Sequence, residues 1–476
     1  MIRTRIAPSP TGKLHIGTAR TALFNYLYAK NQGGTYVLRI EDTDKNRSTK
    51  ESEHDILAGL EWLGIGADEG VTTEGELGDL GPYRQSDRTG TYRQYLEVLI
   101  ESGDAYWCPT SGEELDRLKK EADASKQPFI YRPEHRDGRY EYQEGSVLRF
   151  KVPDEVIWFE DKIKGKIEFD TSLMGDFVIA KGWDNPLYNF VVVIDDELMQ
   201  ITHIIRGEDH ISNTPKQILI NRALGFKRKN FGHMPLILAP DKSKMSKRHG
   251  ATSVEDYRAL GYLPEAMVNF LALLGWNEGN DREDYTLEEL VQKFSLKRVQ
   301  KSGAVFNKEK LDSINAKYIR ALPIAEKVRI GSEFLTHNGF DLDKLSQSQL
   351  EQIISIECDR IKTFGEIGDD VKFFFETPEY DGEILVWKNM TAEEAKASLE
   401  WVKEQVYNID EDSYTEIESR LKEIINESDW GMGQVLWPLR VALSGQERSP
   451  SPFEIMQVLG KDETLARIDQ AIQKLS

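Results

Sequence analysis

Cysteine is almost missing from this chain: Cys108 and Cys358 are the only two among 476 residues. Two thiols cannot form a disulfide framework, and they are typical of a protein kept in a reducing compartment. Apolar runs are short as well, since stretches such as Phe190 to Ile194 have the length of core elements rather than the ~20 residues of a membrane span. The first residues contain no apolar h-region, so no signal peptide is expected. We therefore expect a cytoplasmic protein without a membrane segment.

The chain also has fewer basic than acidic residues. Its formal net charge is −20, which taken alone argues against a polyanionic partner such as RNA. Net charge, however, governs solubility, whereas binding depends on local patches. Basic residues cluster at 227–229, 242–248 and 297–301. An acidic chain with such local faces would bind RNA with an affinity that falls steeply with salt.

The stretch from Ile2 to Gly17 predicts a strand, a turn and a helix. Residues 2–7 alternate as in a strand, and Pro8 and Pro10 end it because proline fixes φ and lacks a donor. From Gly17 the apolar residues follow one face of a helix. His15 then lies in a strand-to-helix turn, where open α/β sheets bind ligands and free N–H groups meet phosphates. Alone, this pattern also fits an ordinary loop.

A second stretch, residues 241–250, is strongly basic. It contains three lysines and one arginine (D-K-S-K-M-S-K-R-H-G). A solvated surface loop would have this composition. An enzyme that uses ATP also needs such a loop, because its cations stabilise the charge on a departing pyrophosphate.

Together the two stretches carry a family resemblance. H-I-G-T from His15 and K-M-S-K-R from Lys244 resemble the HIGH and KMSKS motifs of class I aminoacyl-tRNA synthetases. The flanking sequences resemble those of bacterial-type glutamyl-tRNA synthetases, densely up to Arg320 and more thinly beyond. The fourth HIGH position is Thr18 rather than His, which is usual in the glutamyl family. The flanking sequences are I-A-P-S-P-T-G from Ile6, R-I-E-D-T-D from Arg39, G-P-Y-R-Q-S from Gly81 and I-R-G-E-D-H from Ile205.

Periodicity and resemblance together predict an α/β fold. Strands alternating with helices predict a Rossmann-type parallel sheet. We expect Phe190–Ile194 and Ile201–Ile205 to be central strands with Asp195-Asp196 turning between them, Met234–Leu238 to be the last strand, and no strand after Ser253. The resemblance implies a catalytic domain split into 1–86 and 187–250, an inserted α+β acceptor-binding domain at 87–186, a helical stem-contact domain at 251–322, and an all-α anticodon-binding region at 323–476 with a boundary near 380.

The resemblance further implies a glutamate–tRNA ligase that uses ATP with Mg²⁺. Glutamate would attack the α-phosphate of ATP, and the acyl group would then move to the 3′-terminal adenosine of tRNA(Glu). Such chemistry depends mainly on positioning and on charge stabilisation. The catalytic residues would be His15, Lys244 and Lys247. The ATP-binding residues would be Pro8, Ser9, Gly12, His15, Gly17, Thr18, Lys244, Met245, Ser246, Lys247 and Arg248.

L-glutamate as a substrate requires a cation for its side-chain carboxylate. Arginine suits this role because its planar fork pairs with both oxygens. Arg5 and Arg206 end predicted strands and match family arginines, although an arginine at a strand end is usually a surface residue. Tyr188 matches a substrate-binding tyrosine and would equally suit a half-buried core position. The glutamate-binding set implied by the resemblance is Arg5, Ala7, Ser9, Glu41, Tyr188, Arg206 and Asp209.

Two further positions concern metal and anticodon. Many relatives carry a zinc knuckle that begins C-x-C and closes with C-x-H. Here the first position is Cys108, the second cysteine position is Thr110, and the closing pair is His135 and Asp137. One thiol without a close second one is a poor zinc set, so no structural zinc is expected. Arg360 matches a position where many relatives read the last anticodon base, and it would also suit a salt bridge on a helix surface.

Several alternatives remain open at this stage. The enzyme could also charge tRNA(Gln), since one arginine supports strict selection only thinly. A paralogue that glutamylates a modified tRNA base, or a non-catalytic tRNA-binding paralogue, would explain part of the pattern. A small-molecule nucleotidyltransferase would not need the long helical C-terminal region, and a glutaminyl enzyme would carry β-barrels there. By family resemblance we expect a monomer.

Overall fold

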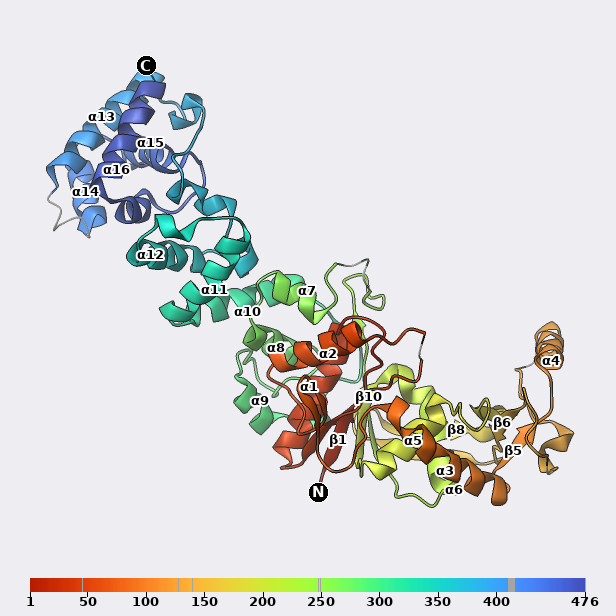
Figure 1. The fold of residues 1–476 in the computed structure, drawn as a ribbon. Helices are drawn as coiled ribbons and strands as arrows, with labels where there is room; N and C mark the ends of the chain where they lie inside the picture. The colour runs from red at the N-terminus through yellow and green to blue at the C-terminus, as the bar shows by residue number, and fades with distance from the viewer. Residues whose placement is uncertain are drawn as a thin grey trace. The chain divides into compact units, whose positions relative to one another are not determined.

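The computed structural model describes residues 1–476 apart from 45, 127, 139, 247, 249, 410–415 and 476, and it describes residue 369 only in its backbone. The chain forms two compact units, one of residues 1–258 with 264–311 and the other of residues 259–263 with 312–476 (Figure 1). Among the described residues, no helix combines the length and apolar character needed to cross a bilayer.

The strands lie in the first unit and the longest helical run lies in the second. The strands are β1 (Arg3–Ile6), β2 (Thr35–Leu38), β3 (Glu69–Thr72), β4 (Gly75–Leu77), β5 (Ala105–Cys108), β6 (Val147–Phe150), β7 (Val156–Asp161), β8 (Gly165–Asp170), β9 (Phe177–Ala180), β10 (His203–Gly207), β11 (Asn230–Met234), β12 (Ile237–Leu238) and β13 (Ala304–Val305). The helices up to the end of the first unit are α1 (Ile16–Asn31), α2 (Lys50–Trp62), α3 (Thr89–Glu101), α4 (Gly112–Ala124), α5 (Tyr188–Leu198), α6 (Thr214–Ala223), α7 (Val254–Ala259), α8 (Pro264–Leu273), α9 (Leu287–Lys293) and α10 (Lys308–Ala321).

A mostly parallel sheet positions the site. β1, β2 and β3 are parallel neighbours, with β4 antiparallel at the edge, and β10, β11 and β7 are parallel, with β8 antiparallel at the other edge. The two sets meet where Thr202, just before β10, donates its N–H to the Arg3 carbonyl at 3.0 Å. Helix α1 packs on β1, β2 and β10, and α8 and α9 pack on α1 (Figure 1). The predicted parallel sheet is therefore confirmed.

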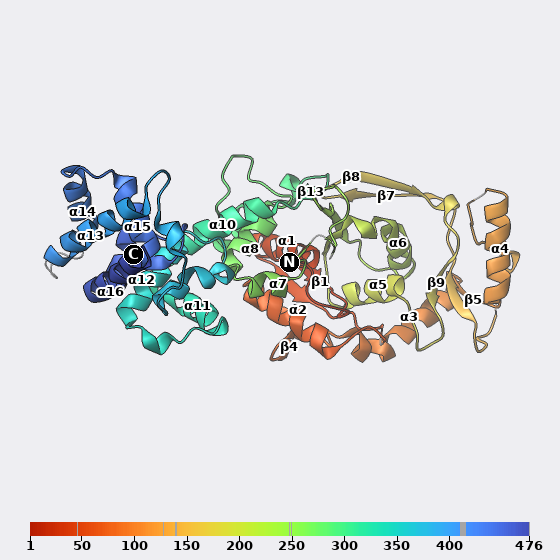
Figure 2. The same ribbon diagram turned by 90° about the horizontal axis from the view of Figure 1, so that it is seen from above.

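Residues of the predicted insertion take part in two sheets. β5, β6 and β9 form an antiparallel sheet of their own. The hairpin of β7 and β8 instead extends the central sheet, because Asp161 pairs with Phe231 of β11. Helix α4 has no fully buried residue, but its Leu115 and Leu118 pack on a cluster formed by Tyr106 and Cys108 of β5 and by Tyr131 (Figure 2).

The predicted strand at Phe190–Ile194 is wrong, because these residues lie in helix α5. All five side chains are at most 6% exposed. A short apolar run that is buried on every side has no periodicity to separate helix from strand, and three valines in a row favour strand by propensity. The predicted turn at Asp195-Asp196 is wrong for the same reason: both residues continue α5 and are buried.

Two smaller predictions also need correction. The single strand predicted at Met234–Leu238 is two strands, since β11 ends at Met234 and β12 covers only Ile237 and Leu238. β12 pairs with β13, a two-residue strand after Ser253 where none was expected. Pairs this short carry no alternating pattern that a sequence could reveal.

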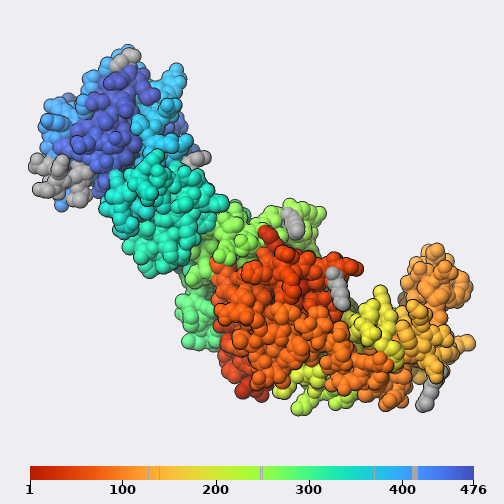
Figure 3. Space-filling model, in the orientation of Figure 1, coloured from red at the N-terminus to blue at the C-terminus, as the bar shows by residue number. Residues whose placement is uncertain are grey.

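The second unit is helical, as predicted. After the end of α10 it contains α11 (Ile324–His337), α12 (Gln347–Cys358), α13 (Ala392–Asn408), α14 (Ile417–Asn426), α15 (Met432–Ser444) and α16 (Pro452–Lys474). A capping box with the pattern S/T-x-x-E/Q begins each of the helices α12, α13 and α16. The teal and blue surface of this unit is continuous in the space-filling view (Figure 3). Cys358 is fully buried at the end of α12.

Candidate active site

A cavity of about 590 Å³ lies at the carboxyl ends of β1 and β10, beside the first turns of α1 and α5. Ligands of open α/β sheets bind at this edge. Most of the sequence-predicted site residues line it: Arg5, Ala7, Pro8, Ser9, His15, Gly17, Thr18, Glu41, Tyr188, Arg206, Asp209, Lys244 and Met245.

Four predicted ATP-binding residues are not in this lining. Gly12 is exposed, and a Cβ placed there would meet no atom within 4 Å. Ser246 and Arg248 belong to the basic loop, where Arg248 donates to the Ser243 hydroxyl at 3.2 Å. Lys247 lies outside the described residues.

His15 caps helix α1. Its Nδ1 accepts the N–H of Gly17 at 3.0 Å, and a Cβ on Gly17 would come within 3.2 Å of that nitrogen. The glycine therefore lets the imidazole fold onto the helix end. Burial, and then the charge of Lys244, lower the pKa of His15. The ring is thus held neutral, with Nε2 left for a ligand.

The start of the basic loop is anchored to the sheet. The backbone of Lys244 pairs with Leu238, and Met245 donates its N–H to the Ile237 carbonyl at 3.1 Å. Met245 is buried, which fixes the chain at this point. Lys244 is therefore presented to the cavity from a defined backbone position.

Two buried arginines reach the cavity from β1 and β10. Arg5 donates its Nε–H to Asp196 at 3.2 Å, and among the described residues no further hydrogen bond holds its terminal nitrogens. Arg206 donates from Nη2 to the Thr214 hydroxyl at 2.8 Å, whereas its buried Nη1 has no partner within the described part of the chain. Burial lowers the pKa of Arg206. Buried guanidinium groups with unbonded nitrogens favour an anionic ligand, because a carboxylate would accept hydrogen bonds from those nitrogens.

Arg206 is held from behind by a buried pair. The Asp161 carboxylate lies 2.6 Å from Nδ1 of His233, and both side chains are fully buried. This places the proton on Nδ1 and leaves Nε2 to accept the Nε–H of Arg206 at 3.3 Å. Burial lowers the pKa of His233, so the ring stays neutral beside the guanidinium.

Glu41 and Tyr188 complete the polar wall. Glu41 pairs with Arg39 at 3.0 Å, and burial raises the pKa of Glu41. The Tyr188 hydroxyl lies 3.1 Å from Nδ1 of His210, and burial raises the pKa of this tyrosine. Burial and the Arg206 charge lower the pKa of His210 to about 4. The carboxylate of Glu41 is the acidic group here that would suit an ammonium group.

The sequence reasoning missed the buried charges beneath the cavity. Arg39 is fully buried and contacts Asp196 at 2.8 Å, so Asp196 binds both Arg39 and Arg5. Asp195 accepts from Arg88 at 2.6 Å and from the Tyr92 hydroxyl at 3.0 Å. The signal for Asp195 and Asp196 is a pair of acidic residues directly after an apolar run, and this pattern also suits a turn.

Arg20 was also missed. It lines the cavity from α1 but turns inward, donating to the carbonyls of Leu274 and Pro235. Burial lowers its pKa to about 10.

The donors around Cys108 do not fit zinc. Its Sγ lies 3.2 Å from the Tyr131 hydroxyl and 3.9 Å from Nε2 of His135, and Tyr131 donates to Thr110 at 2.6 Å. Burial opposes ionisation, but these hydrogen bonds lower the pKa of the Cys108 thiol to about 7. Asp137 pairs with Lys151 instead. Within the described residues no three His, Cys, Asp or Glu side chains are grouped to hold a metal.

Arg360 lies in the second unit, two residues after the end of α12. It is exposed, and its Nη1 is 3.9 Å from Glu357. A contact this long holds the side chain loosely, which is compatible with either of the roles considered for it.

Comparison with known proteins assigns both parts of the chain. A family model described as tRNA synthetases class I (E and Q), catalytic domain, matches residues 1–313, and one described as an anticodon binding domain matches residues 320–472.

Full-length relatives carry one name. A protein of Elusimicrobium minutum named glutamate–tRNA ligase is 43% identical over 99% of this chain and 98% of its own length. Glutamate–tRNA ligase 1 of Syntrophomonas wolfei is 42% identical over 99% and 96%. The crystal structure of a glutamate tRNA ligase from Elizabethkingia meningosepticum, in complex with its amino acid, superimposes with a TM-score of 0.89 at 33% identity, covering all of both chains.

Proposed function

Since the chain belongs to the glutamate–tRNA ligase family of class I tRNA synthetases, we propose that it joins L-glutamate to tRNA(Glu) at the expense of ATP. The observation that carries this proposal is the pair of buried arginines, Arg5 and Arg206, whose open donors meet in one cavity. Two such arginines bind the side-chain carboxylate of glutamate more tightly than the neutral amide of glutamine.

Glutamate would bind with its side-chain carboxylate on the two arginines. Arg5 would be the principal contact, because Asp196 holds its Nε and no hydrogen bond among the described residues engages its terminal nitrogens. Glu41 would pair with the α-ammonium group, and Tyr188 and Ser9 would bound the amino acid. Ala7 and Asp209 would lie at the edge of the same subsite.

ATP would lie along the first turn of α1. The positive end of this helix favours phosphate, although the N–H groups of Ile16 and Gly17 already donate to the Thr252 carbonyl and to Nδ1 of His15. Because Nδ1 of the neutral His15 ring accepts a hydrogen bond, its proton lies on Nε2, which can donate to ATP. Pro8, Gly17 and Thr18 would contact the nucleotide, with Lys244 and Met245 closing from the basic loop. Gly12, Ser246, Lys247 and Arg248 are assigned to ATP on the motif resemblance alone. Mg²⁺ would arrive with ATP, since the described part of the chain contains no cluster of acidic, histidine or cysteine side chains that could hold it.

The reaction would proceed in two displacements. A glutamate carboxylate oxygen attacks the α-phosphorus, and the bond to the β-phosphate breaks to release pyrophosphate. A hydroxyl of the 3′-terminal adenosine then attacks the acyl carbon, and AMP leaves. Lys244 and Lys247 would stabilise the charge that develops on the pyrophosphate.

We propose the same domain ranges as the family resemblance implies: a catalytic domain at 1–86 and 187–250, an acceptor-binding domain at 87–186, a stem-contact domain at 251–322 and an anticodon-binding region at 323–476. The three-stranded sheet of β5, β6 and β9 would hold the acceptor end, and Arg360 would meet the anticodon. Two free cysteines support a reducing, cytoplasmic setting, and we propose a monomer.

The proposal is tested by separating its two steps. Lys244→Ala should slow adenylate formation, measured as ATP–pyrophosphate exchange with tRNA present, and leave tRNA affinity nearly unchanged. Lys164→Ala, which alters a paired lysine outside the cavity lining, serves as the control. A Lys244→Ala variant that activates glutamate normally but binds tRNA weakly would move the loop's role to RNA binding.

A further inference from the structure

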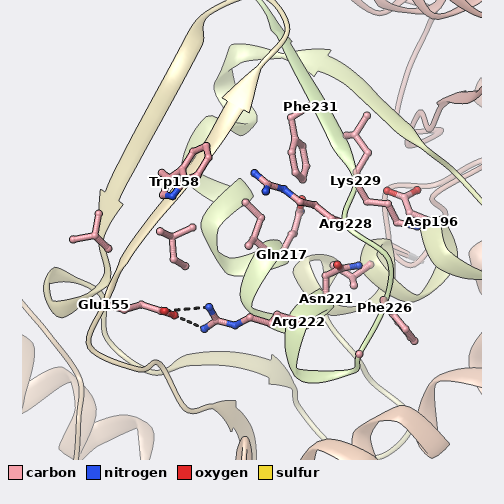
Figure 4. A pocket seen from close by; sticks show the side chains of 16 residues that line it. Glu155, Trp158, Asp196, Gln217, Asn221, Arg222, Phe226, Arg228, Lys229 and Phe231 are labelled. Carbon is pink, nitrogen blue, oxygen red and sulfur yellow. Dashed lines mark hydrogen bonds and ion pairs between the residues drawn. The ribbon is translucent and has the colours of Figure 1, made fainter.

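A second cavity of about 410 Å³ opens in the first unit, away from the candidate active site (Figure 4). Its walls come from α5, α6, β7 and the first residues of β10 and β11. The active-site cavity lies at the opposite, carboxyl ends of the parallel strands, and the two cavities share no lining residue. A volume of this size holds a small organic molecule.

The walls of this cavity combine apolar and aromatic side chains with charged and amide side chains. Phe231 of β11 and Ile204 of β10 line the cavity on the side of the sheet, and Val193 lines it from α5. Trp158 on β7 remains 51% exposed, although tryptophan is a costly side chain to leave in water. An aromatic side chain beside a hollow offers a flat face to a planar ring.

One cation of the cavity has no anionic partner among the residues that the structure describes. Arg222 is paired with Glu155 at 3.0 Å, and Lys229 is paired with Glu197 at 2.6 Å. Arg228 makes no ion pair or hydrogen bond with any described residue, and its guanidinium lies 5.4 Å from the centre of the Trp158 ring. Figure 4 shows this group reaching into the cavity between Trp158, Phe231 and Gln217. The cavity therefore combines an aromatic face with an open positive charge.

From this geometry we propose that the cavity binds a small planar aromatic molecule that carries one acidic group, a carboxylate or a phosphate. The ring lies against Trp158 and Phe231, and the acid pairs with Arg228. The amide of Asn221, which has no side-chain hydrogen bond among the described residues, faces the ring as donor or acceptor. The site shares no lining residue with the active-site cavity, although Asp196, which holds Arg5, lines it.

Two matched pairs of probes test this. Indole-3-acetate and indole-3-acetamide differ in one group, a charged carboxylate against a neutral amide, and phenyl phosphate and phenol differ by a phosphate. Calorimetric titration of the full chain is expected to show each acid binding about tenfold or more tightly than its neutral partner. Binding of indole-3-acetate alone identifies a carboxylate ligand, and binding of phenyl phosphate as well extends the site to phosphate monoesters.

The variant Arg228→Ala should remove the advantage of the acids and leave the neutral compounds unaffected. Trp158→Ala should weaken all four. Arg93→Ala is the control, because Arg93 also lies over a tryptophan ring, Trp183 at 4.8 Å, but does not line the cavity. Aminoacylation should be normal in the Arg228 variant, which shows that it is folded. Equal binding of acids and neutral compounds, unchanged binding in Arg228→Ala, or displacement of the acids by ATP would each overturn the proposal.

Discussion

At the scale of single residues, burial decides what each charged group in the active-site cavity can do. Arg5 and Arg206 are both about 5% exposed, yet their supports differ. A carboxylate, Asp196, holds Arg5, whereas a neutral histidine and a hydroxyl hold Arg206. Arg206 therefore keeps more of its positive charge uncompensated and depends more on an incoming anion.

Replacing Arg5 by leucine should raise the KM for glutamate about 10- to 100-fold, since a charged hydrogen bond contributes about 1.5–3 kcal/mol. It should also weaken discrimination against glutamine, because the fork no longer rewards a carboxylate. Steady-state kinetics with both amino acids measure this. Unchanged discrimination would remove Arg5 from the role.

His233 is expected to act by positioning Arg206. His233→Asn removes the acceptor at the Nε2 position and should raise the KM for glutamate, with a smaller effect on kcat. His233→Gln keeps an acceptor near that position and should restore most of the affinity. A purely structural role for His233 predicts instead that both variants lose stability and activity alike, without a selective change in KM.

His203 gives a pH dependence of stability. Burial, and then the charge of Lys162, lower its pKa to about 4, against about 6.5 in an unfolded chain. Between these values the unfolded state binds a proton that the folded state does not. The stabilisation is therefore fully present above about pH 6.5 and is lost as the pH falls toward 4.

His203→Gln should flatten this dependence by about 1.4 kcal/mol per pH unit within that window. Urea unfolding of both proteins between pH 4.5 and 7.5 measures the slope. Parallel slopes would mean that His203 titrates normally in the folded chain.

At the scale of elements, helix α5 joins the pieces of the site. Tyr188 begins it at the cavity, and the buried carboxylates of Asp195 and Asp196 end it beneath Arg5 and Arg88. The sequence predicted the cavity residues on this helix but not the helix itself. Motifs specify local chemistry, whereas an apolar run such as 190–194 becomes helix or strand according to tertiary packing that no local pattern contains.

Asp195→Asn should lower the free energy of unfolding by about 3 kcal/mol or more, because it leaves Arg88 buried without its charge partner. Asp184→Asn, at an exposed position in the same segment, should change it by less than about 0.5 kcal/mol. Denaturant titration compares the two. Equal small effects would mean that Arg88 finds another partner.

At the scale of the whole molecule, the sequence predicted the order of sheet and helical parts well. The alternation of strands and helices up to residue 250 and the helical pattern beyond it are local signals, and both parts formed, although residues 190–194 are helix instead of the predicted strand. Pairing between distant strands was not predictable in this way. The hairpin of β7 and β8 joins β11 across some 70 residues, and that choice depends on the assembled sheet.

The charge distribution of the chain is also a property of this scale. The net charge of −20 coexists with a cavity whose walls carry Arg5, Arg206 and Lys244. Local burial rather than net charge therefore sets what the site attracts.

The central claim is best tested by charging purified tRNA(Glu) and tRNA(Gln) in parallel with labelled glutamate, ATP and Mg²⁺, and by repeating both reactions with labelled glutamine. We expect glutamate to be transferred to tRNA(Glu) and glutamine to be transferred to neither tRNA. Transfer of glutamate to tRNA(Gln) as well would keep the ligase and discard Arg360 as a discriminator. Transfer of glutamate to neither tRNA, by protein that still binds ATP, would contradict the account.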